Sequence, residues 1–193
     1  MNYKIVLGSK SPRRRELLQQ AGLEFELRVH SVVERYPKDL KREEIPLFLA
    51  ELKAEPFIGK LKSNEIVITA DTIVWKDDTV YEKPKDKKEA FEILKELSNA
   101  SHEVVSAVCL ATNDKKVTFY ESTTVYFKNL ADRDIRLYID NYEVTDKAGA
   151  YGIQEWIGLI GIEKIEGCYY NVVGLPVAKL ITQLKTHFDY RFG

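Results

Sequence analysis

The sequence is poor in the residues that build disulfide frameworks and histidine-based metal centres. It has 2 cysteines and 3 histidines in 193 residues. Cys109 and Cys168 are too few for the cross-linked framework of a small secreted domain, and both lie in apolar-rich sequence, as buried reduced thiols do. His30, His102 and His187 lie far apart and match no metal-ligand spacing. These counts argue against a disulfide scaffold and against a zinc site.

The chain also lacks an excess of charge and a long apolar run. Its 29 basic and 30 acidic residues give a net charge of -1, so no overall field attracts it to nucleic acid or to membranes. No segment approaches the roughly 20 apolar residues of a transmembrane helix. The N-terminal segment places its cations after a short apolar stretch, unlike a secretory signal. We therefore expect a soluble cytoplasmic protein that binds neither nucleic acid nor membrane.

The hydrophobic pattern predicts an alternating α/β order, in one domain over residues 1–193. Strands are expected over 3–7, 25–29, 66–75, 103–112 and 117–127, and helices over 12–22, 43–61, 86–97, 131–141 and 175–188. Pro56 is expected to kink or split the second helix. The glycine-punctuated, aromatic stretch 148–167 is expected to be loop and strand. A sheet of these strands can form two lobes with a central cleft.

The first candidate site is a run of cations at the start of the first predicted helix. Ser9-Lys10-Ser11-Pro12-Arg13-Arg14-Arg15 follows a short strand and Gly8. Each cation beside a helix N-terminus is unfavourable by about 0.3–1 kcal/mol, so the arrangement favours a bound anion such as phosphate. The alternative is that the arginines extend into solvent and that one pairs with Glu16. The spacing is not that of a Walker A loop.

The second candidate is Asp71, inside the apolar run 66–74. A carboxylate in a buried strand costs several kcal/mol unless a cation or hydrogen bonds compensate it. A divalent ion beside a triphosphate would do so, since Mg²⁺ needs only one or two protein carboxylates. Glu34, in a polar loop, is a candidate for the second one. The alternative is that the strand breaks near Ala70 and leaves Asp71 in an exposed turn.

Three further residues are weaker candidates when each is taken alone. Lys83, fixed by the following Pro84, could reach a phosphate, and so could Lys53 on the second helix. Gln154 lies in a glycine-rich segment, and its amide can read both a donor and an acceptor on a base edge. The alternatives are two solvated lysines and a tightly packed turn.

Taken in order along residues 3–185, these segments resemble the Maf family. The matching segments are Ser9–Arg14 with Glu16–Leu18, Ala70–Thr72, Glu82–Pro84, Ser101–Val104, Lys147–Gln154 and Val172–Pro176. Each motif is short, but the ordered set is specific. The resemblance implies a mixed α/β fold, built on a single mixed sheet and related to the inosine triphosphate pyrophosphatases, with the active site in a cleft between lobes. It also implies hydrolysis of nucleoside triphosphates to the monophosphate and pyrophosphate with a divalent metal, Mg²⁺ or Mn²⁺.

The resemblance also assigns roles to residues. Asp71 would be the general base and a metal ligand, and Glu34 would help to bind the metal. The residues expected to bind the phosphates are Ser9, Arg13, Arg14, Lys53 and Lys83. The residues linked to base choice are Arg13, Thr72 and Gln154. The pairs 71–72 and 153–154 resemble the dTTP/UTP branch rather than the branch that handles methylated GTP. The expected partner is the nucleotide, and a homodimer is left open.

Some positions depart from the family pattern. Glu155 and Trp156 follow Gln154 where the family usually has glycine, which brings a carboxylate and an indole near the expected base pocket. Pro56, three residues after Lys53, could re-aim that lysine. Two rival functions follow from the same residues. One is a pyrophosphatase for modified nucleotides, and the other is a nucleotide-binding regulator of cell division with weak or no hydrolysis.

Overall fold

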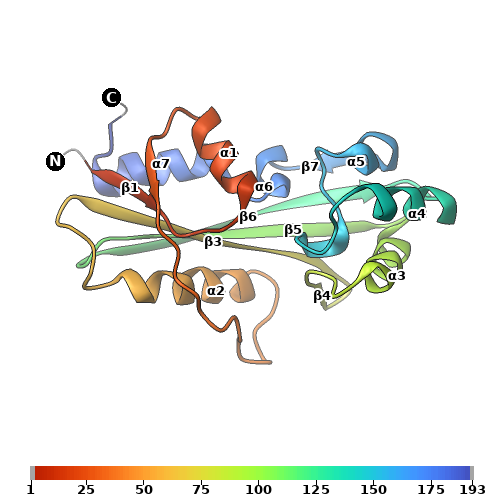
Figure 1. The fold of residues 1–193 in the computed structure, drawn as a ribbon, viewed down its shortest axis with the longest axis horizontal. Coiled ribbons are helices and arrows are strands. Elements are labelled where there is room, and N and C mark those ends of the chain that lie inside the picture. The colour runs from red at the N-terminus through yellow and green to blue at the C-terminus, as the bar shows by residue number, and fades with distance from the viewer. Residues whose placement is uncertain (1–2, 192–193) are drawn as a thin grey trace. The chain divides into compact units, whose positions relative to one another are not determined.

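A computed structural model describes residues 3–191, which form a seven-stranded sheet with helices on its faces (Figure 1). The strands are β1 (Lys4–Leu7), β2 (Phe25–Leu27), β3 (Glu65–Lys76), β4 (Thr79–Tyr81), β5 (Ser101–Ala111), β6 (Lys116–Phe127) and β7 (Ile162–Glu166). The helices are α1 (Pro12–Gln20), α2 (Glu44–Ala54), α3 (Lys87–Leu97), α4 (Asp132–Asn141), α5 (Trp156–Gly161), α6 (Tyr169–Val173) and α7 (Val177–Phe188), with 3-10 turns η1 (Glu55–Phe57) and η2 (Ala148–Ala150). Within residues 3–191 no helix combines the length and apolarity that crossing a membrane requires.

The sheet is mixed, as the resemblance implied. Its strand order is β2-β1-β3-β5-β6-β7, with β4 paired to β3. β1 runs parallel to both β2 and β3, with Ile5 opposite Phe25 on one side and Ile66 on the other. The pairs β3–β4 and β6–β7 are antiparallel. Parallel pairs need crossover connections, and α1 and α2 supply them between the N-terminal strands.

The chain divides into two compact units. The first contains the residues up to Asp71, Ser106–Glu121 and the residues from Gly174 onward, and the second contains Thr72–Val105 and Ser122–Val173. The strands β3, β5 and β6 each give one segment to each unit. Asp71 is therefore the last residue of the first unit on β3.

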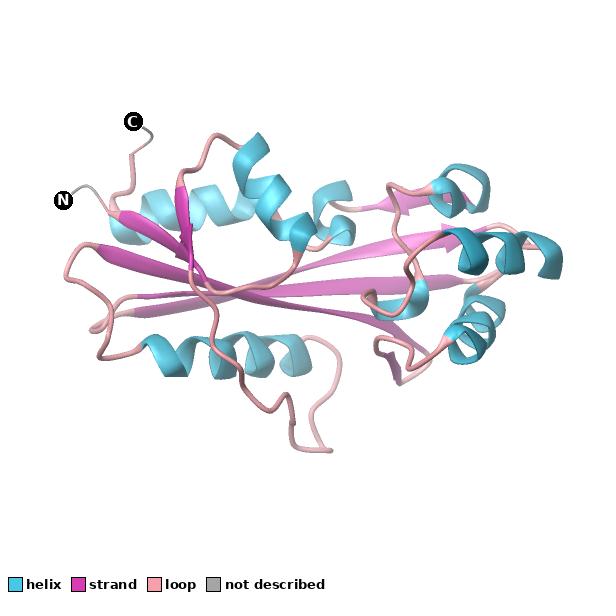
Figure 2. Ribbon diagram, in the orientation of Figure 1, coloured by secondary structure: helices cyan, strands magenta, loops and turns pink. Residues whose placement is uncertain are grey.

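In the first unit, α2 covers one face of the strands, and α1 and α7 cover the other (Figure 2). Side chains of β1, β3 and β5 pack against α2 and η1, with Phe57 only 2% exposed at their centre. The prediction that Pro56 would split the second helix is confirmed. The helix ends at Ala54 and a 3-10 turn follows, because Pro56 has no N–H to continue the α-helical hydrogen bonds.

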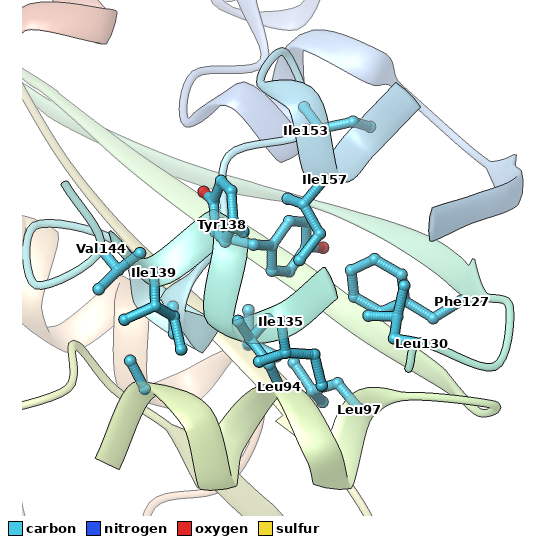
Figure 3. Packing of buried hydrophobic residues seen from close by; sticks show 14 of the residues in the cluster. Leu94, Leu97, Phe127, Leu130, Ile135, Tyr138, Ile139, Val144, Ile153 and Ile157 are labelled. Atoms are coloured by element: carbon cyan, nitrogen blue, oxygen red, sulfur yellow. The ribbon is translucent and has the colours of Figure 1, made fainter. Parts of the chain in front are cut away.

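In the second unit, α3 packs against α4 and η2 over a buried apolar cluster (Figure 3). Leu94 and Leu97 of α3 and Ile135 and Tyr138 of α4 are fully buried in it. The apolar positions on both helices recur at helical spacing, which is why the sequence predicted them. Tyr138 is completely buried, so its hydroxyl lies inside the second unit together with its ring.

The expectation of only loop and strand over 148–167 was wrong in part, because α5 forms there before β7 begins. Glu155 takes the extended N-cap conformation at the start of α5, and Gly158 lets the helix close tightly on the preceding loop. A Cβ at Gly158 would lie 1.9 Å from the carbonyl oxygen of Ile153. Six residues are too few for a hydrophobic period to reveal a helix.

We predict that Gly149→Ala destabilises the protein more than Gly59→Ala. Both glycines have a left-handed backbone, with φ of 69° and 78°, so both substitutions add strain of about 1–2 kcal/mol. Only at Gly149 would the new Cβ also meet a neighbour, Cγ2 of Val74 at 2.7 Å, whereas Gly59 faces open space. The clash should cost a further 1–3 kcal/mol, roughly. Urea unfolding of both variants measures the difference, and equal losses would contradict the packing at Gly149.

Candidate active site

Gly8 lets the turn between β1 and α1 pass close to β3. A Cβ at this position would lie 2.8 Å from Cγ2 of Thr69 and 3.1 Å from the Phe57 ring. The Gly8 N–H donates to the Ile68 carbonyl at 2.9 Å, so the turn continues the pairing with β3. Ser9 follows and is 8% exposed. The turn is thereby fixed beside the strand that carries Asp71.

The N-terminus of α1 is closed by serine hydroxyls. Ser11 is the N-cap, and its Oγ accepts a hydrogen bond from the Arg14 N–H at 3.4 Å, while Pro12 occupies the first helical position. The Ser9 Oγ accepts from the Ser11 N–H at 3.3 Å. Both hydroxyls thus serve the turn itself. Arg13 adds its positive charge at this terminus.

Arg14 bonds to three separate segments of the first unit. Its Nε donates to the Gly174 carbonyl at 3.0 Å, and its Nη1 donates to the Ala70 carbonyl at 2.7 Å and to the Ser9 Oγ at 3.3 Å. Burial lowers the pKa of the guanidinium, the charge of Asp71 opposes that shift, and nearby Arg13 adds to it. Arg14 therefore orients the backbone next to Asp71. Its predicted contact with phosphate stays a prediction.

Asp71 lies inside β3 and is 8% exposed, so the predicted strand is confirmed and the alternative of an exposed turn is wrong. The Lys53 Nζ lies 2.6 Å from the Asp71 Oδ1 and 2.8 Å from the Glu34 Oε2. Lys53 stands in the last turn of α2, where the helix dipole favours a cation. The cation that compensates the strand carboxylate is therefore a lysine that the sequence alone marked as a weak candidate.

Glu34 and Asp71 together fit a divalent ion that arrives with a phosphate ligand. Their carboxylates converge on one ammonium, which shows that both can reach a single cation. Among residues 3–191 no group of three or more His, Cys, Asp or Glu side chains forms a complete metal centre. Mg²⁺ is often held by only one or two carboxylates, with water and substrate phosphates completing its octahedral shell. The pair suits such a shared site.

The second unit carries the remaining three predicted residues, Thr72, Lys83 and Gln154. The Gly149 N–H donates to the Glu82 carbonyl at 3.3 Å, which ties the segment of Lys83 to the glycine-rich segment before Gln154. Gln154 is exposed at an open cavity of about 370 Å³. The other lining residues are Ile153, Gly158, Leu159, Ile162, Glu163, Lys164, Ile165 and Tyr169.

The structure thus gives each predicted site residue of the first unit an interaction with another one. Direct contacts join Ser9 to Arg14 and join Glu34 and Asp71 to Lys53, and Arg13 interacts electrostatically with Arg14. Sequence reasoning missed the carbonyls of Ala70 and Gly174 as partners of Arg14. Both lie in segments that matched the family, but nothing in a motif says which backbone group accepts from which side chain.

The whole chain is similar to known proteins of one family. The family model described as "Maf-like protein" matches residues 4–187. Proteins named dTTP/UTP pyrophosphatase from Flavobacterium johnsoniae and Parabacteroides distasonis are each 50% identical, over 95% and 96% of this chain and the same shares of theirs. A solved nucleoside-triphosphatase, the dITP/XTP pyrophosphatase from Mycobacterium abscessus, is 15% identical with a TM-score of 0.47, over 94% of this chain and 96% of its own.

We predict that Arg14→Ala lowers the stability of the protein whereas Arg13→Ala does not. Without Arg14 the buried Ala70 and Gly174 carbonyls lose a donor, which should cost about 1–3 kcal/mol for each group. Removing Arg13 relieves repulsion at a helix N-terminus and should change stability by less than about 1 kcal/mol.

Thermal unfolding without nucleotide tests this difference. Arg15→Ala, which removes an exposed arginine from the same helix, is the matched control and should unfold near the native midpoint. Equal midpoints for Arg14→Ala and Arg15→Ala would show that the contacts of Arg14 do not stabilise the fold.

Proposed function

Because the chain belongs to the Maf family, we propose that it hydrolyses dTTP and UTP to the nucleoside monophosphate and pyrophosphate. The observation that carries the proposal is Asp71, a carboxylate buried in an apolar strand and paired with Lys53. A structural strand gains nothing from a buried carboxylate, whereas a hydrolase needs a base held at a fixed place. The names of relatives that are 50% identical support the same reaction and the same two substrates.

In the proposed reaction, Asp71 accepts a proton from the water that attacks the α-phosphorus. Asp71 and Glu34 would hold Mg²⁺ or Mn²⁺, which when bound supplies positive charge to the phosphate oxygens and makes a bound water more acidic. Lys53 would then leave the carboxylates and pair with phosphate. This exchange would remove the Lys53 contact from the Asp71 Oδ1 and leave that oxygen available to accept a proton.

The positive side chains would stabilise the leaving pyrophosphate. Ser9, Arg13 and Arg14 would do so from the β1–α1 turn and α1, and Lys83 is proposed to add a further positive charge. Fixed charges aimed at developing negative charge usually supply the largest catalytic term. We propose that both units act as one functional domain, working on free nucleotides in the cytoplasm.

We predict that the native protein converts dTTP and UTP to monophosphate and pyrophosphate, and that chelation of divalent ions stops turnover. Asp71→Asn should lose at least about 100-fold in kcat, because the nearly isosteric amide cannot accept the proton. Chromatography of the nucleotide products, together with a pyrophosphate assay, measures both. Orthophosphate and nucleoside diphosphate as the products would refute the proposal. Nucleotide binding without turnover would favour the regulatory rival.

We also predict that UTP is a better substrate than CTP. The Gln154 amide can donate to O4 and accept from N3–H of uracil or thymine, whereas cytosine presents the opposite pattern at both positions. Unpaired polar groups cost roughly 1–3 kcal/mol, which corresponds to about 5- to 150-fold in kcat/KM. Gln154→Ala should narrow the gap. Equal kcat/KM for the two nucleotides in the native enzyme would remove Gln154 from base recognition.

A further inference from the structure

The carboxylate of Glu155 points toward the interior of the second unit, where it contacts Tyr138 and Lys147. Its Oε2 accepts a short hydrogen bond from the Tyr138 hydroxyl, and its Oε1 lies 3.1 Å from the Lys147 Nζ. The Glu155 side chain is 19% exposed and that of Lys147 only 6%, while Tyr138 is fully buried. Both carboxylate oxygens are therefore engaged by the protein, although the neighbouring Gln154 is exposed.

The same network holds the backbone just before Gln154. The Tyr138 hydroxyl accepts from the Gly152 N–H at 3.0 Å, and the Glu155 N–H donates to the Gly152 carbonyl at 3.0 Å. A Cβ at Gly152 would lie 2.8 Å from Cδ of Glu155, so only glycine leaves room for this carboxylate. Gln154 stands between the two residues that these contacts fix. In Figure 3, Tyr138 lies on α4 facing the segment that carries Ile153.

The network places one lysine between two carboxylates of the second unit. The Lys147 Nζ also donates to the Asp146 Oδ1 at 2.8 Å and to the carbonyl of Glu143, so its charge is held by three partners. Burial, and after it the hydrogen bond to Glu155, raises the pKa of the Tyr138 hydroxyl, which therefore remains a donor at neutral pH. A buried polar network whose members are satisfied makes its surroundings rigid.

We propose that Glu155 is a positioning residue that fixes the Gly152–Glu155 turn, and with it the orientation in which Gln154 reads the base. The inference rests on the proposed role of Gln154. An amide distinguishes uracil from cytosine only if its donor and acceptor ends hold one orientation, and displacements near 1 Å at such positions cost up to about 100-fold in rate. Glu155 acts here through Tyr138 and Lys147, without touching the nucleotide.

The test compares Glu155→Ala and Tyr138→Phe with the native enzyme. The ratio of kcat/KM for UTP to that for CTP should fall by about 3-fold or more in both variants, because the loop loses the contacts that fix it. Glu155→Gln keeps an acceptor for the Tyr138 hydroxyl and should retain a ratio above that of Glu155→Ala. Glu92→Ala, which removes an exposed carboxylate of α3 in the same unit, is the matched control and should keep the native ratio.

Amide hydrogen exchange over residues 151–155 tests whether Glu155 orders this turn, and it does so independently of whether Gln154 recognises the base. Exchange should be faster in Glu155→Ala than in Glu92→Ala, whichever base the enzyme prefers. A native enzyme without preference for UTP would overturn the role of Gln154 in base choice, and faster exchange would still support the ordering by Glu155. Native exchange in Glu155→Ala, or a native UTP to CTP ratio in a Glu155→Ala protein with a lowered unfolding temperature, would overturn the inference.

Discussion

The pairing of Lys53 with Asp71 is the interaction on which the first unit's site depends. A carboxylate within a buried strand is costly unless a charge compensates it, and here the ammonium lies 2.6 Å away. The position of Lys53 follows from the chain around it. Pro56 ends α2 shortly after Lys53, so the lysine occupies the last turn, where the helix dipole favours positive charge. A proline therefore helps to place the partner of the strand carboxylate.

A second cation near Asp71, Arg14, lies at the N-terminus of a helix, whereas Lys53 lies at a helix C-terminus. Arg14 stands in the first turn of α1, where positive charge is unfavourable, and it gains backbone carbonyls in return. One of these carbonyls belongs to Ala70, the residue before Asp71. The arrangement explains an arginine at a helix N-terminus without requiring a bound anion for Arg14. Arg13 is therefore a stronger candidate than Arg14 for binding a phosphate.

The sequence predicted the features that depend on local patterns. The long strands and helices, the break at Pro56 and the strand around Asp71 each follow from residues close together in the chain. The partner of Asp71 lies 18 positions away and a partner of Arg14 lies 160 positions away, so neither could be read from a motif. Short elements such as β4 and α5 escaped prediction because three or six residues carry too little periodicity.

The inward carboxylate of Glu155 also escaped prediction, and for the same reason. Its position in the chain placed it beside Gln154, but its partners Tyr138 and Lys147 lie 17 and 8 positions away. From the sequence, Tyr138 could be predicted only as a buried residue on the apolar face of α4, and not as a partner of Glu155. From the sequence alone, Glu155 could be taken for a residue that contacts the base. In the structure its carboxylate supports the loop instead.

The two carboxylate systems show two ways in which the protein pairs a carboxylate with a lysine. Asp71 and Glu34 share one lysine that can leave, because phosphate offers that lysine a new partner when a divalent ion takes its place in the proposed reaction. Glu155 accepts a hydrogen bond from Tyr138 and pairs with Lys147, which also contacts Asp146 and the Glu143 carbonyl, and no nucleotide would replace these partners. The first arrangement suits a group that must change partners during turnover. The second suits a group that must hold a neighbour still, and the difference lies in what surrounds each lysine rather than in the carboxylates themselves.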